Sequence, residues 1–483
     1  MLFCDLMITL INQAGVDAHS LQRTLGVWQL VLLGIGAIIG AGIFVATGIV
    51  AAEHTGPAVV LSFLIAGFAC LLAGLCYAEF AALVPVSGSA YSYASIAFGR
   101  GAGWMVGWCL SLEYLMAAAN VAVGWSGYVS SLLQSAGVTF WPVLSSPPFT
   151  VTSSGELVRT GAAANLPAIL VLTLLTAILS RGTKISVGVN AVLVAVKLTA
   201  IGLFVCWGAF YVDPANWKPF IPANTGEYGA FGWSGVLRGA GIIFYAYLGF
   251  DTVSTAARET LNPQRAMPIA ILGSLLVCTL IYIAFALVLT GLAPYSLLAA
   301  PHPASVALSH AGPRLNGLKL AVDAGAVVGL TSVILVLLYG QSRILFAMSQ
   351  DGLVPAIFGR VGARSRAPTA CIMASGAIAI LAAGLLPVHV LGELISIGTL
   401  CAFVFVCGGV LLLRIKRPEL KRPFRTPCAP LTCVAGALVC GYLMAALPGA
   451  TWLRFTAWLA VGAAVYVFYG RRRGTRANIP FAR

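Results

Sequence analysis

About twelve apolar runs long enough to cross a membrane follow one another along this chain, and they limit its possible folds more than any other feature. Their approximate spans are 28–51, 57–84, 101–133, 163–180, 185–210, 234–257, 267–292, 318–347, 368–386, 392–413, 429–447 and 452–470. A helix needs about 20 apolar residues to cross the hydrocarbon core. In lipid every backbone polar group must be paired within the protein, so these runs are expected as helices. The sequence predicts an all-α membrane protein with twelve transmembrane helices.

The composition excludes a soluble fold. Hydrophobic residues make up 60% of the 483 residues and charged residues only 9%, whereas soluble domains are about 25% charged. The mean hydropathy is +0.96. A soluble protein has too little interior to bury this much apolar surface. We therefore expect the lipid bilayer to surround most of the chain.

The positions of the basic residues indicate orientation rather than nucleic-acid binding. The formal net charge is +14, but no basic face exists outside the short connections between apolar runs. Of the 28 lysines and arginines, 21 fall on the side of the N-terminus and six on the other: Arg159, Lys218, Arg238, Arg314, Lys319 and Arg454. Basic residues in short loops mark the cytoplasmic side. We expect a protein of the inner (plasma) membrane, no nucleic-acid partner, and cytoplasmic tails at residues 1–25 and 471–483.

No pattern in the sequence indicates an enzyme, a metal site or a cofactor. The twelve cysteines form no CxxC pair and no Cys/His cluster with metal-ligand spacing, so we expect them to pack between helices as small apolar groups. The histidines are expected to be solvated in tails and loops: His19, His54, His302, His310 and His389. No Walker loop and no Ser/His/Asp grouping occurs.

The first apolar run is rich in glycine, which has two interpretations. Residues 34–44 read GIGAIIGAGIF, with glycine at 34, 36, 40 and 42. Each glycine weakens a helix by roughly 1 kcal/mol relative to alanine. Small residues four apart, such as Gly36 and Gly40, allow close helix packing. Alternatively, the helix is interrupted in mid-membrane, and its free N–H groups face an anionic group of a substrate.

The sixth run favours the second interpretation. Residues 241–251 read GIIFYAYLGFD, so a glycine and a carboxylate interrupt an aromatic stretch in the middle of a span. Runs one and six correspond in position if the first ten helices form two halves of five. Interrupted segments at matching positions of two halves indicate the binding site of a transporter. The spacing therefore predicts a five-plus-five inverted repeat with discontinuous helices 1 and 6.

Lys197 lies at least nine residues from either end of the fifth run. A lysine in the middle of a membrane helix costs roughly 2.5–3.5 kcal/mol on insertion scales, so it must face protein or a wet cavity. One interpretation is a structural lysine bonded to helix carbonyls. The other is a cation close to the substrate site that exchanges a proton during transport.

Three carboxylates also fall within apolar runs. Glu113 lies in the third run and Asp251 closes the interruption of the sixth. Each could bind a cationic group or relay protons, or could simply hydrogen-bond to backbone exposed at a helix break. Glu79 is closer to the cytoplasmic end of the second run, where it would serve as a gate or a structural residue.

Four motifs follow one another along the chain: LG…GIGAIIGAGIFV at 25–45, YAEF…PVSGSAY at 77–91, FD…NPQR at 250–265 and YGQSR…MSQDGLVP at 339–355. In order and at the expected spacing, they resemble the amino acid–polyamine–organocation superfamily, particularly its cationic amino acid transporter branch. The resemblance implies the five-plus-five fold with two added helices, that is, a transporter core at 26–413 followed by helices 11 and 12 at 414–470. It also implies a site between the broken helices 1 and 6.

The resemblance assigns roles to particular residues. Ile38, Ala41 and Gly42 would meet the carboxylate of an amino-acid substrate. Backbone carbonyls would receive its amine, and its amino group and side chain would lie against Tyr245, Ala246, Tyr247 and Leu248. Lys197 matches a family lysine that stands where related transporters bind sodium, which implies proton coupling. Glu113 and Asp251 match acids that line the substrate path.

Two positions depart from the family pattern. Ala41 stands where many relatives have a hydroxyl residue, and Arg258 precedes Glu259 where relatives commonly have two acids. The resulting hypothesis is a proton-coupled permease, working by alternating access, for a neutral or cationic amino acid. An exchanger of an amino acid against its amine is the alternative of the same fold. A channel is disfavoured because no repeated filter or charge ring is visible.

Overall fold

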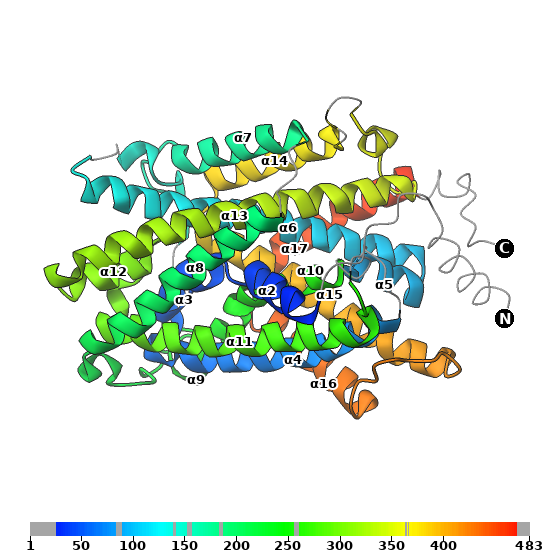
Figure 1. Ribbon diagram of the computed structural model, residues 1–483, viewed down its shortest axis with the longest axis horizontal. Coiled ribbons are helices and arrows are strands. Elements are labelled where there is room, and N and C mark those ends of the chain that lie inside the picture. The colour runs from blue at the N-terminus through cyan, green and yellow to red at the C-terminus, as the bar shows by residue number, and fades with distance from the viewer. Residues whose placement is uncertain are drawn as a thin grey trace.

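The computed structural model describes residues 26–470 except 84–88, 139–141, 152–156, 183–186, 256–259, 363, 364 and 366. The tails predicted at 1–25 and 471–483, together with Arg258, lie outside the described residues. Long helices lie side by side along the longest axis of the molecule (Figure 1). The only sheet among the described residues is an antiparallel pair, β1 (Phe149–Val151) and β2 (Leu157–Arg159), with Phe149 opposite Arg159.

The α-helices account for most of the described chain. In order, they are α2 (Val27–Ile38), α3 (Thr47–Val50), α4 (Val59–Leu83), α5 (Ser89–Phe98), α6 (Arg100–Ser135), α7 (Leu166–Ser180), α8 (Val187–Gly208), α9 (Gly232–Ile243), α10 (Phe250–Thr255), α11 (Pro263–Leu292), α12 (Pro303–His310), α13 (Asn316–Gln350), α14 (Thr369–Leu385), α15 (Val388–Lys416), α16 (Ala429–Ala445) and α17 (Gly449–Val465).

Within the described residues, seven helical stretches are long and apolar enough to cross a membrane: Gly42–Leu83, Arg100–Ser135, Val192–Tyr211, Pro263–Leu292, Pro313–Gln350, Val388–Lys416 and Gly449–Gly470. Shorter apolar helices accompany them at Val27–Ile38, Leu166–Ser180, Thr369–Leu385 and Ala429–Ala445. The chain is therefore an all-α, multi-pass membrane protein, as its composition predicted.

The helices form two groups that meet around the middle of the molecule. In one group α11 packs along α4 and α2, and α4 also packs on α9. In the other, α13 packs on α6 and α8, while α14 lies against α7; Figure 1 shows α7 and α14 on one edge and α4 and α11 on the opposite edge. Helix α15 packs mainly on α6 and α16 and also touches α4. A site between the two groups would change shape if they moved relative to each other.

One end of the molecule gathers arginines, and we name it the basic end. Arg100 at the start of α6 donates from Nη2 to the backbone oxygen of Asp351, which follows α13, at 3.0 Å. Arg414 in the last turn of α15 reaches Glu79 near the end of α4. The ends of α4, α13 and α15 therefore meet the start of α6 there.

Apolar-run counting found the long helices but missed three short elements. It did not predict α5, α12 or the β1–β2 pair, because none of them contains an apolar run of membrane length. The cysteine expectation was wrong for Cys206 and Cys428, which are exposed; the other described cysteines are buried.

The expectation of solvated histidines was wrong for three of them. His54 and His389 lie in helical turns, where His54 Nδ1 is 2.9 Å from the oxygen of Gly229 and His389 Nδ1 is 3.2 Å from Glu53 Oε2. The Nδ1 atom of His302 is buried. The ring of each of these three histidines therefore lies against a residue that is distant from it in the sequence.

Candidate substrate cavity between two broken helices

The first helix is interrupted in its middle, as its glycines predicted. Helix α2 ends at Ile38, and Ile39 has extended backbone angles (φ −72°, ψ 104°). A bend at Gly40 follows, and helical structure resumes at Ala41 and continues as the π-helical segment Gly42–Ala46. The first N–H groups of the resumed helix have no partner within it. They lie at the level of the interruption.

Lys197 on α8 fills the interruption from one side. Its Nζ donates to the backbone oxygens of Gly36 and Ile39, the latter at 2.9 Å. The side chain is fully buried. Its ammonium therefore replaces helical N–H donors at the point where the helix is broken. The two interpretations of this lysine are thus not exclusive, because a structural contact places it at the site.

The sixth helix is interrupted at Leu248 and Gly249. Helix α9 tightens into a 3-10 turn at Phe244–Tyr247, and Leu248 is extended (φ −57°, ψ 136°). Gly249 then adopts φ +118°, and α10 begins at Phe250. Ser396 on α15 replaces backbone pairing there: its Oγ accepts from Tyr245 N at 3.3 Å and donates to Ile242 O at 2.8 Å.

The two interruptions touch each other. A Cβ at Gly42 would overlap Ala246, and a Cβ at Gly249 would lie 2.6–2.9 Å from backbone atoms of Ala37 and Ile38. Only glycine permits these approaches, and positive φ at Gly249 adds a second reason. Tyr282 on α11 lies beside both interruptions, with its hydroxyl 3.0 Å from Ile38 O and 2.7 Å from Ala246 O.

A small cavity of about 30 Å³ lies where the interruptions meet. Its lining residues come from both broken helices and from α6, α13 and α15: Ala37, Ile38, Gly40, Ala41, Gly42, Ala117, Asn120, Val121, Tyr245, Leu248, Val333, Leu337 and Ile395. Most of these side chains are apolar. Such volume admits water but is too small for a whole amino acid, so a substrate of that size requires the helix groups to separate.

The polarity of the helix ends suits a zwitterion. The resumed first helix presents its N-terminal end to the cavity through Ala41 and Gly42, and the first part of the sixth helix presents its C-terminal end through Tyr245. Helix N-termini carry partial positive charge and C-termini partial negative charge. The carboxylate of a small zwitterion would therefore be attracted to the N-terminal helix end on one side of the cavity. Its ammonium group would be attracted to the C-terminal helix end on the other side.

The structure brings together most of the residues that the sequence placed at the site. Ile38, Ala41, Gly42, Tyr245 and Leu248 line the cavity. Two others do not. Ala246 packs against the Gly42 position instead, and Tyr247 points to α4, where its hydroxyl donates to Phe63 O at 2.9 Å.

The predicted acids lie next to the cavity rather than in its lining. Glu113 and Asp251 are buried, and the Tyr114 hydroxyl is 3.4 Å from Asp251 Oδ2. The Oε2 atom of Glu113 has no hydrogen-bond partner among the described residues. Neither carboxylate is among the residues that line the cavity, so proton relay through them stays a prediction.

Sequence reasoning missed three polar residues at the site. Asn120 lines the cavity and donates from Nδ2 to Val388 O at 3.1 Å; Ser396 and Tyr282 hold the backbone of the interruptions. Asn120 is a polar residue in the middle of an apolar run, which is a signal that could have been used. Ser396 and Tyr282 carried no such signal, because hydroxyl groups are common in membrane helices.

An all-helical membrane protein with two broken helices around a buried cavity belongs to the class of membrane transporters. Comparison with known proteins identifies the family. Residues 25–468 match the family model described as amino acid permease. The chain therefore belongs to the amino acid permease family, within the amino acid–polyamine–organocation superfamily that its motifs resembled, and it is a transporter rather than an enzyme.

Three relatives illustrate the range of the family. The methylthioribose transporter of Bacillus subtilis (strain 168) is 44% identical, over 95% of this chain and 96% of its own length. The branched-chain amino acid permease BcaP of the same organism is 41% identical over 94% of both chains. The chloroplastic cationic amino acid transporter 9 of Arabidopsis thaliana is 41% identical over 83% of this chain and 68% of its own length.

Proposed function

We propose that this protein is a secondary active amino-acid transporter that works by alternating access and couples transport to protons. The observation that carries the proposal is the cavity between helix ends of opposite polarity. Backbone groups at broken helices bind the charged ends of an amino acid without any charged side chain in the lining. The binding residues are Ile38, Ala41 and Gly42 for the carboxylate and the backbone of Tyr245–Leu248 for the amine.

The proposed architecture is a five-plus-five inverted repeat with twelve spans. The interruptions at Ile39–Gly40 and Leu248–Gly249 support it, because they fall at equivalent places of two halves. The basic end, which carries Arg100 and Arg414, faces the cytoplasm by the positive-inside rule. Both termini then lie in the cytoplasm of a cell whose plasma membrane holds the protein.

Lys197 is the proposed site of proton coupling. It contacts Gly36 O and Ile39 O at the interruption that binds the substrate. Loss of a proton from its ammonium weakens these contacts, which would loosen the first helix at the cavity. Protonation and the shape of the site are coupled in this way without a metal ion.

The lining favours a neutral substrate over a cationic one. Ala117, Val121, Val333, Leu337 and Ile395 present apolar side chains to the cavity. Burying a cationic side chain against them costs free energy that no acid in the lining offsets. Glu113 and Asp251 stand outside it, so they fit proton movement better than side-chain recognition.

Exchange of an amino acid against an amine is the second candidate mechanism. The buried carboxyl groups of Glu113 and Asp251 favour it, because they could attract a cationic amine that lacks a carboxylate. The names of the relatives broaden the substrate list to methylthioribose, branched-chain and cationic amino acids.

The test is uptake of radiolabelled leucine into proteoliposomes, with and without an inward pH gradient. Competitors are the twenty amino acids, methylthioribose and the amine of each basic amino acid. We expect competition by apolar amino acids and uptake only with the gradient. Competition by arginine and its amine, together with uptake that requires internal substrate, would favour the exchanger; competition by methylthioribose alone would refute amino-acid transport.

A further inference from the structure

A groove of about 490 Å³ opens at the basic end, remote from the substrate cavity. One wall is the start of α11 and the other is the segment between α15 and α16. Its polar lining is Asn262, Gln264 and Arg265, and its apolar lining includes Ile269, Leu272 and Phe424. Polar groups at one end and apolar groups along the walls suit an amphipathic ligand.

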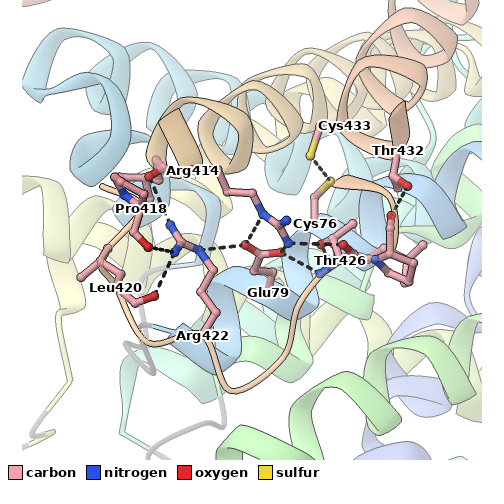
Figure 2. Close-up of polar contacts among 12 residues, drawn as sticks. Cys76, Glu79, Arg414, Pro418, Leu420, Arg422, Thr426, Thr432 and Cys433 are labelled. Carbon is pink, nitrogen blue, oxygen red and sulfur yellow. Dashed lines mark hydrogen bonds and ion pairs between the residues drawn. The ribbon is translucent and has the colours of Figure 1, made fainter. Parts of the chain in front are cut away.

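The second wall of the groove is held rigidly. Figure 2 shows Glu79 of α4 receiving two hydrogen bonds from Arg414, Nε to Oε1 at 3.0 Å and Nη2 to Oε2 at 2.6 Å. Arg422 Nε lies 3.3 Å from Glu79 Oε1, and Thr426 N donates to Oε2 at 2.8 Å. Phe424 lies between Arg422 and Thr426 in the sequence, and both of these residues contact Glu79. The wall is therefore a fixed surface and not a loose loop.

Arg265 supplies an available positive charge at the mouth of the groove. Its side chain is exposed and has no hydrogen bond or ion pair within the described part of the chain. Lys421 and Arg425, on either side of the second wall, are exposed and without a side-chain partner there too. No acid is found among the described residues that line the groove. The charge of this opening complements an anionic group.

The apolar lining continues into a face of α11 whose apolar side chains are exposed. Ile269, Leu276 and Leu280 are 46%, 63% and 60% exposed. Their spacing of seven and four residues places them on one side of the helix. The neighbouring α4 exposes Phe68 and α16 exposes Leu438. In a bilayer this apolar face meets acyl chains, while the groove lies at the end of the helix, where headgroups are.

We propose that the groove binds an anionic phospholipid of the leaflet at the basic end. Arg265 pairs with the phosphate, Asn262 and Gln264 contact the headgroup, and an acyl chain follows Ile269 and Leu272 along α11. Basic pockets at the membrane surface attract anionic headgroups through charge. Free phosphate would leave the apolar walls without a partner, so the ligand chemistry is that of a lipid.

The test is native mass spectrometry of the purified protein titrated with dioleoyl phosphatidylglycerol or dioleoyl phosphatidylcholine. The variants are R265Q and, as a matched control, R360Q, an exposed arginine of the same end that does not line the groove. We expect R265Q to bind the first phosphatidylglycerol about fivefold more weakly, because it loses the electrostatic attraction of one basic residue. R360Q should bind like wild type, and phosphatidylcholine binding should be the same in all three proteins.

A second variant and a competitor complete the experiment. F424A removes an apolar wall without changing charge, and it should weaken phosphatidylglycerol binding severalfold, whereas glycerol phosphate should not compete. Equal phosphatidylglycerol affinity in wild type and R265Q would overturn the proposal. Full competition by glycerol phosphate would also overturn it. A dimer that forms only when Arg265 is present, and that excludes lipid from the groove, would do the same. Leucine uptake by R265Q verifies that the variant is folded.

Discussion

At the scale of single residues, Lys197 makes the structural contacts that one of its two sequence-based interpretations predicted, and proton coupling stays a proposal. A buried ammonium is costly unless its protons are hydrogen-bonded. Here the bonds go to Gly36 O and Ile39 O, carbonyls that a continuous helix would use itself. The lysine therefore stabilises a backbone shape that exists only because the helix is broken.

Replacing Lys197 with alanine should abolish uptake driven by a pH gradient while the protein is still produced. The helix carbonyls lose their donor, and the variant lacks the group that we propose takes up the proton. The measurement is labelled-leucine uptake in proteoliposomes with an inward pH gradient. Lys319→Ala, which removes an exposed lysine bonded to Ser135 Oγ at 3.1 Å, is the control. Gradient-driven uptake at the wild-type rate in Lys197→Ala would refute the coupling role.

At the scale of elements, the interruption of the sixth helix depends on a residue that no side chain can replace. Gly249 has φ +118°, and a Cβ added there would lie 2.6 Å from the carbonyl carbon of Ala37. Gly202 on α8 is the matched contrast, since a Cβ there would meet nothing within 4 Å.

Gly249→Ala should therefore reduce leucine uptake strongly and lower the melting temperature, because the new methyl group pushes the two interruptions apart. Strain of this kind costs about 1–3 kcal/mol. Gly202→Ala should keep uptake and gain up to about 1 kcal/mol from helix propensity. Thermal unfolding in detergent and uptake are measured on the same samples. Equal melting temperatures for the two variants would contradict the close approach.

The segment between α15 and α16 depends on Glu79 in a comparable way. Removing one partner of a buried ion pair costs about 3–5 kcal/mol, whereas exposed pairs contribute about 0–1 kcal/mol. Glu79→Ala should lower the melting temperature by several degrees. Glu419→Ala breaks only the exposed 3.5 Å pair with Arg417 and should change it little. If both variants melt alike, the cluster in Figure 2 does not anchor the segment.

The sequence predicted elements far better than the contacts between them. Glycines in mid-span, together with Asp251 in the sixth run, were enough to place both interruptions, because those residue types are costly in a membrane helix without a reason. The partners Ser396 and Tyr282 were not predictable, since each lies more than 30 residues from the atoms that it contacts. The orientation of Tyr247 toward Phe63 O likewise depends on packing that periodicity does not encode.

At the scale of the whole molecule, the end opposite the basic end includes α12, which packs on α11, α13 and α3 (Figure 1). His302 precedes this helix, and its Nδ1 is buried without a partner among the described residues. Its ring lies 6.3 Å from that of Tyr128, whose hydroxyl donates to Phe44 O at 2.7 Å. This end is therefore packed around a buried imidazole nitrogen. Burial, helped by the nearby charge of Lys319, lowers the pKa of His302 from 6.5 to about 4.

Acid should weaken the fold through His302. Its pKa is lower in the folded protein than in the unfolded chain, so unfolding takes up a proton as the pH falls from about 6.5 to about 4. The contribution of His302 to the free energy of unfolding is therefore complete above pH about 6.5 and is lost as the pH falls to about 4. The melting temperature of wild type should fall more steeply from pH 7 to 4 than that of His302→Gln. The exposed His310→Gln should follow wild type, and identical slopes for wild type and His302→Gln would exclude this source of acid sensitivity.

We infer that peptide groups at the two broken helices bind the carboxylate and the ammonium group of an amino acid. The most direct test is a cryo-electron microscopy map of the purified protein with bound leucine. We expect density for a ligand whose carboxylate lies about 3 Å from the N–H groups of Ala41 and Gly42. The ammonium of the ligand should lie beside the carbonyls of Tyr245–Leu248. Ligand density beside Glu113 and Asp251, with both interruptions untouched, would contradict it.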